Sequence, residues 1–207
     1  MPASIQYVMF DLGVVLLHLD YELARDACVR LCDPKKLAEG GRFLSLLGRA
    51  PEEDANERGD LSVQNLFNYF AESTGFCGSL QEFIEIWRGI FRENDPMIEF
   101  GRELEKRYPI YFMTNAGDIH VPWVFDRFPR LRFFRDVAAS CYINAMKPEA
   151  LFYTRALAKF NVSAESSLFI DDRPENIESA RAAGFRCVLY KNPEQAIGET
   201  INLLEST

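Results

Sequence analysis

Short apolar segments alternate with helical segments along most of this 207-residue chain, and this alternation restricts its fold more than any other feature. Strands covered on both faces are continuous apolar runs. Such runs occur at residues 5–10, 110–113, 167–170 and 187–190, with a weaker one at 137–140. Helical periodicity occurs at residues 96–107, 148–159, 175–183 and 193–204. This order predicts an α/β fold, a Rossmann-like doubly wound parallel sheet with helical crossovers.

The segment between the first two predicted strands is too long for a simple crossover and contains no good strand candidate. Its apolar spacing predicts four helices, at residues 21–32, 35–47, 61–73 and 80–91, with Pro51 and Gly59 in an irregular middle. We therefore predict a core domain of residues 1–19 and 93–207 and an inserted four-helix cap domain of residues 20–92. Aromatic residues at helical spacing are predicted to form the interior of this cap: Phe67, Phe70, Phe83 and Trp87.

The acidic balance of the chain restricts its partners. The formal net charge is -8 and the pI is about 4.9. Nucleic acid and anionic membranes both need a cationic face, so we expect neither as a partner. The apolar run of residues 14–19 contains His18 and is too short to cross a bilayer, and no secretory signal precedes it. We predict a cytoplasmic protein that is a monomer or a homodimer.

Polar residues stand where the predicted strands end or where a helix of the second half begins. Open parallel sheets bind their ligands beyond the carboxyl ends of their strands, so we expect these side chains to meet in one site. The residues are, in chain order, Asp11, Thr114, Asn115, Lys147, Asp171 and Asp172.

The acidic members of this set favour phosphoryl transfer with a metal ion. A carboxylate at the edge of an apolar core is costly to leave unpaired, and Asp11 is well placed there to attack phosphorus, although it could instead cap the following turn. Asp171 and Asp172 would repel each other unless a cation lies between them and Asp11. Hard carboxylate oxygens suit Mg²⁺. Capping of a helix explains one of the two adjacent acids, not both.

The remaining members can hold a phosphoryl group. Lys147 can neutralise charge on Asp11 and on a phosphate, and the Thr114 hydroxyl and the Asn115 backbone N–H can donate to phosphate oxygens. Phosphoryl transfer depends mainly on positioning and on charge neutralisation, and these are the groups that it needs.

Four ordered segments resemble the four motifs of the haloacid dehalogenase superfamily: residues 10–15, 113–115, 147–149 and 169–172. The resemblance spans nearly the whole chain and implies a Rossmann-like core, a small helical cap, an aspartyl-phosphate intermediate and Mg²⁺. Residues 11–20, 57–62 and 171–177 more closely resemble the bacterial α-D-glucose-1-phosphate phosphatases, a branch near the phosphatase domain of bifunctional epoxide hydrolases. This closer likeness implies a phosphatase for a small phosphorylated metabolite, a sugar phosphate.

The resemblance also implies a role for each matching residue. Asp11 would be the nucleophile, Thr114 and Asn115 would bind the phosphate, and Lys147 would bridge nucleophile and phosphate. The metal ligands would be the carboxylates of Asp11 and Asp172, the backbone carbonyl of Gly13, and Asp171 either directly or through a water molecule. Asn176 would brace this loop, although a role at the helix start explains it equally well.

The chain departs from the family pattern at Gly13, where phosphatases commonly carry a second aspartate that acts as general acid and base. This leaves the proton donor unassigned. Asp20 and His18 lie nearby, but Asp20 is expected to cap a helix and His18 to lie at the cap hinge. Asn144 replaces a common glycine, and asparagine tolerates left-handed geometry.

Two residues beyond the four motifs are weaker candidates. Arg58, in the segment 57–60, is the leading candidate for a substrate contact from the cap, although a solvated turn explains this segment equally well. His120 aligns with a histidine of the sugar-phosphatase branch, but a structural role is the more common one for a lone histidine.

Two other functions stay open at this stage. A 2-haloacid dehalogenase also uses an aspartate nucleophile and lacks the second aspartate, but it needs no Mg²⁺ and carries no acidic pair like Asp171 and Asp172. A catalytically degraded binding or regulatory protein would explain Gly13, but it would not explain the retention of Asp11, Thr114 and Lys147.

Overall fold

The computed structural model of the chain describes residues 4–40 and 51–206. Its centre is a five-stranded parallel sheet in the order β5-β4-β1-β6-β7. The strands are β1 (Tyr7–Phe10), β4 (Ile110–Thr114), β5 (Asp136–Ala139), β6 (Ser167–Asp171) and β7 (Arg186–Leu189). After β1 the chain first extends the sheet on one side through β4 and β5, and then on the other side through β6 and β7. The strand order therefore reverses at β1, where doubly wound sheets bind their ligands.

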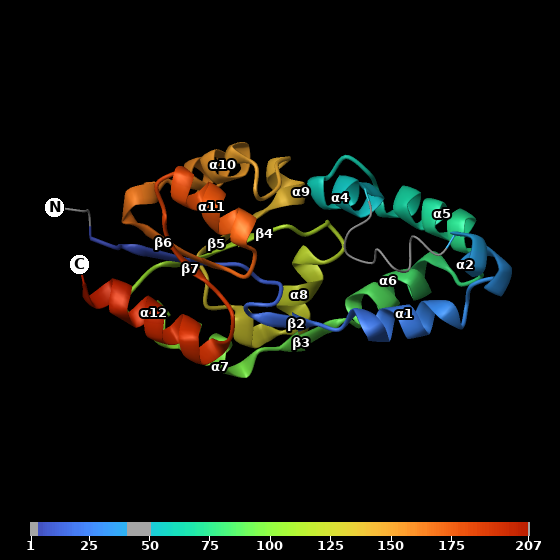
Figure 1. Cartoon of the computed structure of the whole chain (residues 1–207), viewed down its shortest axis with the longest axis horizontal. Helices are drawn as coiled ribbons and strands as arrows, with labels where there is room; N and C mark the ends of the chain where they lie inside the picture. Colours follow the sequence, from blue (N-terminus) through green and yellow to red (C-terminus); the bar gives the residue numbers. More distant parts are fainter. Residues whose placement is uncertain (1–3, 41–50, 207) are drawn as a thin grey trace.

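Helices cover both faces of this sheet (Figure 1). On one face lie α7 (Asp95–Glu105), α8 (Val121–Arg127) and α12 (Pro193–Glu205), whose apolar residues pack on Phe10 and Phe112. On the other face lie α10 (Ala150–Phe160) and α11 (Pro174–Ala182), which pack on Met9 and Phe169. Alternate side chains of a strand point to opposite faces, so Met9 and Phe10 belong to different halves of the core.

Residues 20–92, here called the cap segment, are mainly helical where they are described and extend away from one end of the sheet (Figure 1). The helices are α1 (Tyr21–Val29), α2 (Pro34–Gly40), α4 (Pro51–Arg58), α5 (Val63–Thr74) and α6 (Leu80–Arg88). Ser62 caps the start of α5, and a capping box of Ser79 and Glu82 starts α6. The four aromatic residues predicted for the interior pack together, and Phe83 and Trp87 stack with ring centroids 4.7 Å apart. That prediction is confirmed.

A two-stranded antiparallel ribbon joins the two parts. β2 (Leu17–Leu19) enters the cap segment and β3 (Phe91–Glu93) leaves it, and His18 pairs with Arg92. The predicted domain boundaries fall at this ribbon, and the division into two domains stays a prediction. The ribbon was not predicted, because three residues per strand are too few for a periodic signal in the sequence.

The predicted strands and helices of the core are present to within a few residues, whereas α8 and the short helix α9 (Ser140–Ile143) were not predicted. The parallel α/β fold is confirmed. The cap differs, because Pro51–Arg58 is a helix (α4) and not an irregular middle, so the described part already exceeds four helices. Pro51 occupies the first position of α4, where proline is favoured, and its missing N–H costs nothing there. The predicted helix 35–47 begins as α2, and residues 41–47 lie outside the described residues. Within the described residues, no helix is both long enough and apolar enough to cross a membrane.

Candidate active site

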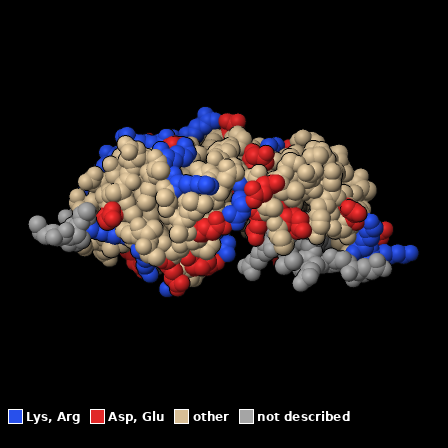
Figure 2. Space-filling model, turned by 90° about the horizontal axis from the view of Figure 1, so that it is seen from above, with Lys and Arg blue, Asp and Glu red and all other residues tan. Residues whose placement is uncertain are grey.

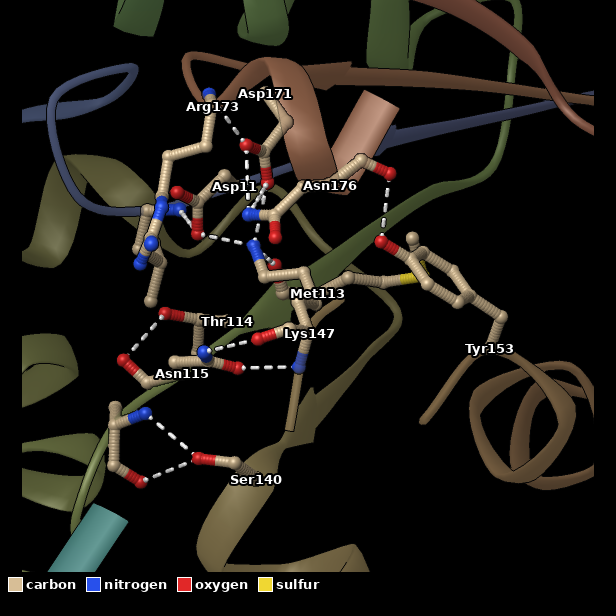
Figure 3. Close-up of polar contacts among 12 residues, drawn as sticks. Asp11, Met113, Thr114, Asn115, Ser140, Lys147, Tyr153, Asp171, Arg173 and Asn176 are labelled. Carbon is tan, nitrogen blue, oxygen red and sulfur yellow. Dashed lines mark hydrogen bonds and ion pairs between the residues drawn. The ribbon is translucent and has the colours of Figure 1, made fainter. Parts of the chain in front are cut away.

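The predicted residues meet at the carboxyl ends of β1, β4 and β6 (Figure 3). Asp11 follows β1 directly, Thr114 ends β4 and Asp171 ends β6. Register brings these ends together, because Phe10 pairs with Phe112 on one side and with Ile170 on the other. The adjacency of strands far apart in sequence thus builds the site, as their common polar ends predicted.

Lys147 is a fully buried cation at the centre of the site. Its Nζ donates to Asp11 Oδ1 at 2.9 Å, to Asp171 Oδ2 at 2.7 Å and to the Met113 carbonyl at 2.8 Å. An ammonium group has three donors, so all three are engaged. Burial alone would lower the pKa of Lys147, but the two carboxylates raise it above its ordinary value. The predicted contact with Asp11 is present, whereas a contact with phosphate would require one of these three bonds to be shared or exchanged.

Asp171 is completely buried and bonded on both oxygens. Oδ1 accepts from the Arg173 backbone N–H at 2.9 Å and from Asn176 Nδ2 at 2.9 Å, while Oδ2 accepts from Lys147. Asn176 is itself held through its backbone carbonyl, which accepts from Tyr153 Oη at 2.7 Å. Asp171 therefore fixes the position of Lys147, and Asn176 braces Asp171 as predicted.

Three carboxylates share a small volume that fits a metal ion. One oxygen from each of Asp11, Asp171 and Asp172 lies within 4.8 Å of the other two. Burial raises the pKa of Asp11 to about 7 against the opposing effect of Lys147, and the charges of Asp171 and Asp172 raise it further. Burial, followed by the charge of Asp171, also raises the pKa of Asp172. Hard oxygen donors carrying excess negative charge are the donor set that Mg²⁺ favours.

Two further atoms bear on this donor set. Asp11 Oδ1 accepts from the Leu12 backbone N–H at 2.7 Å as well as from Lys147, and within the described chain Oδ2 accepts no hydrogen bond, which leaves it for a substrate or a metal ion. The Gly13 carbonyl, predicted as a ligand, accepts from the Val15 N–H at 2.6 Å and keeps its second lone pair.

The loop after β4 offers the predicted phosphate contacts. Thr114 is buried and lines a pocket together with Asn115. The Asn115 side chain is already engaged, because its amide donates to the Lys147 carbonyl at 3.0 Å and accepts from the Lys147 N–H at 2.9 Å. The side-chain amide is therefore occupied, and the predicted contact of the Asn115 backbone N–H with a phosphate stays a prediction. These two hydrogen bonds also fix the Lys147 backbone to this loop.

The pocket lies between the core and the cap segment and is mostly apolar. Its apolar lining residues are Leu12, Leu17, Leu19, Tyr21, Leu66, Trp87, Ile90, Phe91, Ala116, Val121 and Val124. Its polar lining residues are Glu53, Asn56, Glu57, Thr114, Asn115 and His120, with Gly13 at its side. Burial, together with the charge of Arg88, lowers the pKa of His120 to about 4, so this imidazole is neutral at physiological pH.

Arg58, the predicted substrate contact of the cap, bonds to the core. Its guanidinium makes two bonds to Glu149, at 2.9 and 2.6 Å, and lies 3.6 Å from Asp60. Glu149 belongs to the predicted motif that begins at Lys147. The structure thus brings Arg58 to the cap–core interface, and its role in substrate binding stays a prediction.

Other candidates occupy structural positions. Asp20 caps α1 by accepting from the Leu23 N–H at 3.3 Å, as predicted. His18 was predicted at the cap hinge, and it lies exposed on β2, the strand that enters the cap segment. Asn144 has the predicted left-handed conformation with φ 49°. Glu57 and Ser140 were missed. The segment 57–60 was singled out, but its pattern pointed to Arg58 and not to Glu57. Ser140 acts through its spatial neighbours, which no sequence pattern reveals.

The family of the chain follows from its sequence as well as from this site. The sequence model of the haloacid dehalogenase-like hydrolases matches residues 44–190, which is more than half of the chain. The protein therefore belongs to the haloacid dehalogenase-like hydrolases. The suspected resemblance is confirmed.

Solved structures share the fold over nearly the full length. A predicted HAD-like family hydrolase from Porphyromonas gingivalis covers 99% of this chain and 100% of its own, with TM-score 0.81 and 25% identity. A HAD family enzyme from Bacteroides thetaiotaomicron, solved in complex with magnesium and inorganic phosphate, covers 91% of this chain and 95% of its own, with TM-score 0.76 and 20% identity.

Two fungal proteins are similar in sequence over shorter segments. The sesquiterpene phosphatase astK of Aspergillus oryzae is 29% identical over 140 residues, which are 62% of this chain and 66% of astK. The drimenol cyclase drtB of Aspergillus calidoustus is 24% identical over 97 residues, 47% of this chain and 18% of drtB. The chain thus matches just under two thirds of the first protein and less than a fifth of the second.

Proposed function

We propose that this hydrolase is a Mg²⁺-dependent phosphatase that forms an aspartyl-phosphate intermediate on Asp11. One observation carries the proposal: Asp11 lies within 4.8 Å of Asp171 and Asp172, oxygen to oxygen, while the buried Lys147 bonds to Asp11 from within the core. A nucleophile, a fixed cation and an acidic pair are the parts that phosphoryl transfer needs. The relative named as a phosphatase and the related magnesium complex support the same chemistry.

The residues of the chain divide the work as follows. Lys147 holds Asp11 in one orientation and stabilises its negative charge, so that a free carboxylate oxygen faces the incoming phosphorus. The Thr114 hydroxyl and the Asn115 backbone N–H hold oxygens of the transferring group. When Mg²⁺ is bound by Asp11, Asp172 and the Gly13 carbonyl, it neutralises charge on the phosphate. Asp171 keeps Lys147 in place, and the overlying cap segment excludes water from the reacting centre.

Two candidate substrate classes result, because the resemblance and the pocket lining favour phosphomonoesters of different alcohols. The likeness to α-D-glucose-1-phosphate phosphatases implies a sugar phosphate. The mostly apolar lining, with side chains such as Trp87 and Phe91, favours a phosphomonoester of an apolar alcohol as the second candidate. The name of the fungal relative, a sesquiterpene phosphatase, agrees with the second. Rates on α-D-glucose 1-phosphate and on dimethylallyl monophosphate separate the two.

The remaining predictions belong to this proposal. A small phosphorylated metabolite is the partner, the protein acts as a monomer or a homodimer, and it acts in the cytoplasm. Two other functions are less well supported. A 2-haloacid dehalogenase would have no use for the closely spaced Asp171 and Asp172, and a degraded binding protein would not need the Lys147 ion pair with Asp11.

The deciding experiment measures phosphate release from 4-nitrophenyl phosphate with Mg²⁺, with a chelator, and with the variant Asp11→Asn. We expect turnover that the chelator abolishes and that the variant lacks, because the variant has no attacking charge. Asp126→Asn, the same change on an exposed residue, is the control and should leave the rate unchanged. Turnover by a folded Asp11→Asn variant would refute the proposal. Halide release from 2-chloropropionate without Mg²⁺ would identify a dehalogenase.

A further inference from the structure

The proposed reaction needs a proton for the departing alcohol, and the residues first considered for this role are occupied elsewhere. Gly13 has no side chain where phosphatases of this superfamily commonly carry an aspartate. Asp20 caps α1, and His18 is exposed on the β2 strand. Neither Asp20 nor His18 lines the pocket beside the nucleophile, which Leu12, Gly13 and Thr114 line.

Glu57 brings a carboxyl group to that pocket from the cap segment. It lies in the last turn of α4 and lines the same pocket as Gly13 and Thr114. Leu12 and Gly13, the two residues that follow Asp11, line this pocket too, and the charge of Asp11 is among those that raise the pKa of Glu57. The acid that is missing at position 13 thus has a counterpart across the pocket.

The end of α4 is held against the core. The backbone carbonyl of Glu57 accepts from Ser140 Oγ at 2.6 Å, and the same oxygen of Ser140 accepts from the Ala116 N–H at 2.9 Å. A single hydroxyl therefore connects Glu57 with the loop that carries Thr114 and Asn115. Contact is so close at this point that a Cβ atom on Gly117 would lie 2.4 Å from Asn56 Oδ1.

Glu57 holds a proton at neutral pH. Burial raises its pKa to about 8, helped by the neighbouring charges of Glu53, Asp54 and Asp11 and opposed by Arg173. His120, which lines the same pocket, is neutral and has no comparable proton to give. The titratable groups around Glu57 are Glu53 and Asp54 on its own helix, and Asp11, His120, Cys141 and Arg173 on the core.

Resting on the proposed function, we propose that Glu57 is the catalytic acid and base of this enzyme. In the first step a carboxylate oxygen of Asp11 bonds to phosphorus, the bond from phosphorus to the alcohol oxygen breaks, and the Glu57 carboxyl proton passes to that oxygen. The alcohol leaves and Glu57 is a carboxylate. In the second step water attacks phosphorus and gives a proton to Glu57, and the bond between Asp11 and phosphorus breaks. Phosphate leaves with both side chains restored.

The test compares leaving groups that differ in their need for a proton. Benzyl phosphate releases a poorly acidic alcohol, whereas 4-nitrophenyl phosphate releases a stable phenolate. We expect Glu57→Gln to lower kcat/KM for benzyl phosphate by about 10²–10⁴-fold, and that for 4-nitrophenyl phosphate by less than about tenfold. The variant should also release a burst of 4-nitrophenolate, because its aspartyl-phosphate hydrolyses slowly without a base.

A second measurement needs no variant. In the wild type, kcat/KM for benzyl phosphate should fall as the pH rises past about 8, where Glu57 loses its proton, and 4-nitrophenyl phosphate should lack this decline. The control for Glu57→Gln is Glu52→Gln, the same change on the same helix but outside the pocket lining. It should leave kcat/KM unchanged for both substrates.

Each result has one meaning. The role of Glu57 would be overturned if Glu57→Gln lowered kcat/KM equally for both substrates. It would also be overturned if Glu53→Gln, and not Glu57→Gln, lowered kcat/KM selectively for benzyl phosphate. An identical pH profile for the two substrates would overturn it as well. If the wild type hydrolyses neither phosphate with Mg²⁺, the proposed function fails and this role fails with it. Wild-type turnover with unchanged selectivity in Glu57→Gln refutes the role of Glu57 alone.

Discussion

Val14, three residues after the nucleophile, has a backbone conformation that is costly for its residue type. Its φ is 61°, in the left-handed region, where a β-branched side chain crowds the backbone. The turn is closed by a bond from the Val14 N–H to the Leu17 carbonyl at 2.7 Å. Strain of this kind is kept where the surrounding structure fixes it, and it is concentrated at functional sites. Here the turn leads the chain from Asp11 into the ribbon that enters the cap.

We predict that Val14→Asn stabilises the protein by about 1 kcal/mol, because asparagine tolerates left-handed geometry. The Val14 side chain is 37% exposed, so little apolar burial is lost. Thermal unfolding should show a rise in Tm of roughly 2–4 °C. The control is Val29→Asn, an exposed valine in a regular helix, for which no rise is expected. A Tm gain no larger than that of the control would contradict strain at Val14.

The active-site residues show what a sequence can and cannot reveal at this scale. Asp11, Thr114 and Asp171 were predictable because each directly ends or follows a strand of clear apolar character. The bond partners were not. Lys147 Nζ bonds to Asp11, to Asp171 and to the Met113 carbonyl. These contacts depend on distances between separate elements. No local pattern contains this information.

At the scale of elements, α4 is one of the parts of the cap segment that contact the active-site side of the core. Its end is bonded through Glu57 to Ser140 and through Arg58 to Glu149. Figure 2 views the molecule from the side of α4, α9 (Ser140–Ile143) and α10 and shows acidic and basic side chains close together where the two parts meet. The bond from Arg58 to Glu149 is the main cause of a lowered pKa at Glu149.

We predict that Arg58 acts through Glu149, so that the two residues form one functional unit. Arg58→Gln and Glu149→Gln should each lower kcat/KM for 4-nitrophenyl phosphate by a similar factor, and the double variant should be no worse than either. The side chains are 33% and 39% exposed, so their coupling in stability should be only about 0.2–1 kcal/mol. Asp60→Asn, which removes the longer 3.6 Å contact, serves as the control. A loss seen only in Arg58→Gln would instead indicate a direct substrate contact.

Elements were predictable in proportion to their length and regularity. The strands of the parallel sheet are clear apolar runs, and the helices α7, α10, α11 and α12 have clear apolar periods, so all of these were predicted with small errors at their ends. In contrast, α4 is a polar helix with only Glu53 and Asn56 buried, so it carries no apolar stripe. For that reason α4 was predicted as a loop, and the position of Glu57 in its last turn was not predicted.

At the scale of the whole molecule, negative charge is concentrated in the buried site more than on the surface. The surface in Figure 2 shows both signs interspersed, whereas the buried site gathers Asp11, Asp171 and Asp172 around a single buried lysine. A cation bound at this site would offset the repulsion among these carboxylates, which otherwise lowers the stability of the folded state. Metal binding is therefore expected to contribute to the stability of the entire fold, because ligands that bind only the folded state stabilise it.

The last prediction concerns how this contribution depends on pH. Without metal, the pKa of Asp11 rises from 3.8 to about 7 on folding, so the folded state binds the additional proton between these values and the stability falls as the pH rises from about 4 to 7. Mg²⁺ needs the deprotonated carboxylate and competes with that proton. The Tm increase caused by Mg²⁺ should therefore be small at pH 5 and large at pH 8. At a Mg²⁺ concentration 100 times its Kd the gain is about 2.7 kcal/mol, which corresponds to roughly 5–11 °C. Asp172→Ala should remove most of this increase, whereas Asp126→Asn should retain it. An increase of the same size at both pH values would show that Asp11 does not exchange a proton for the metal ion.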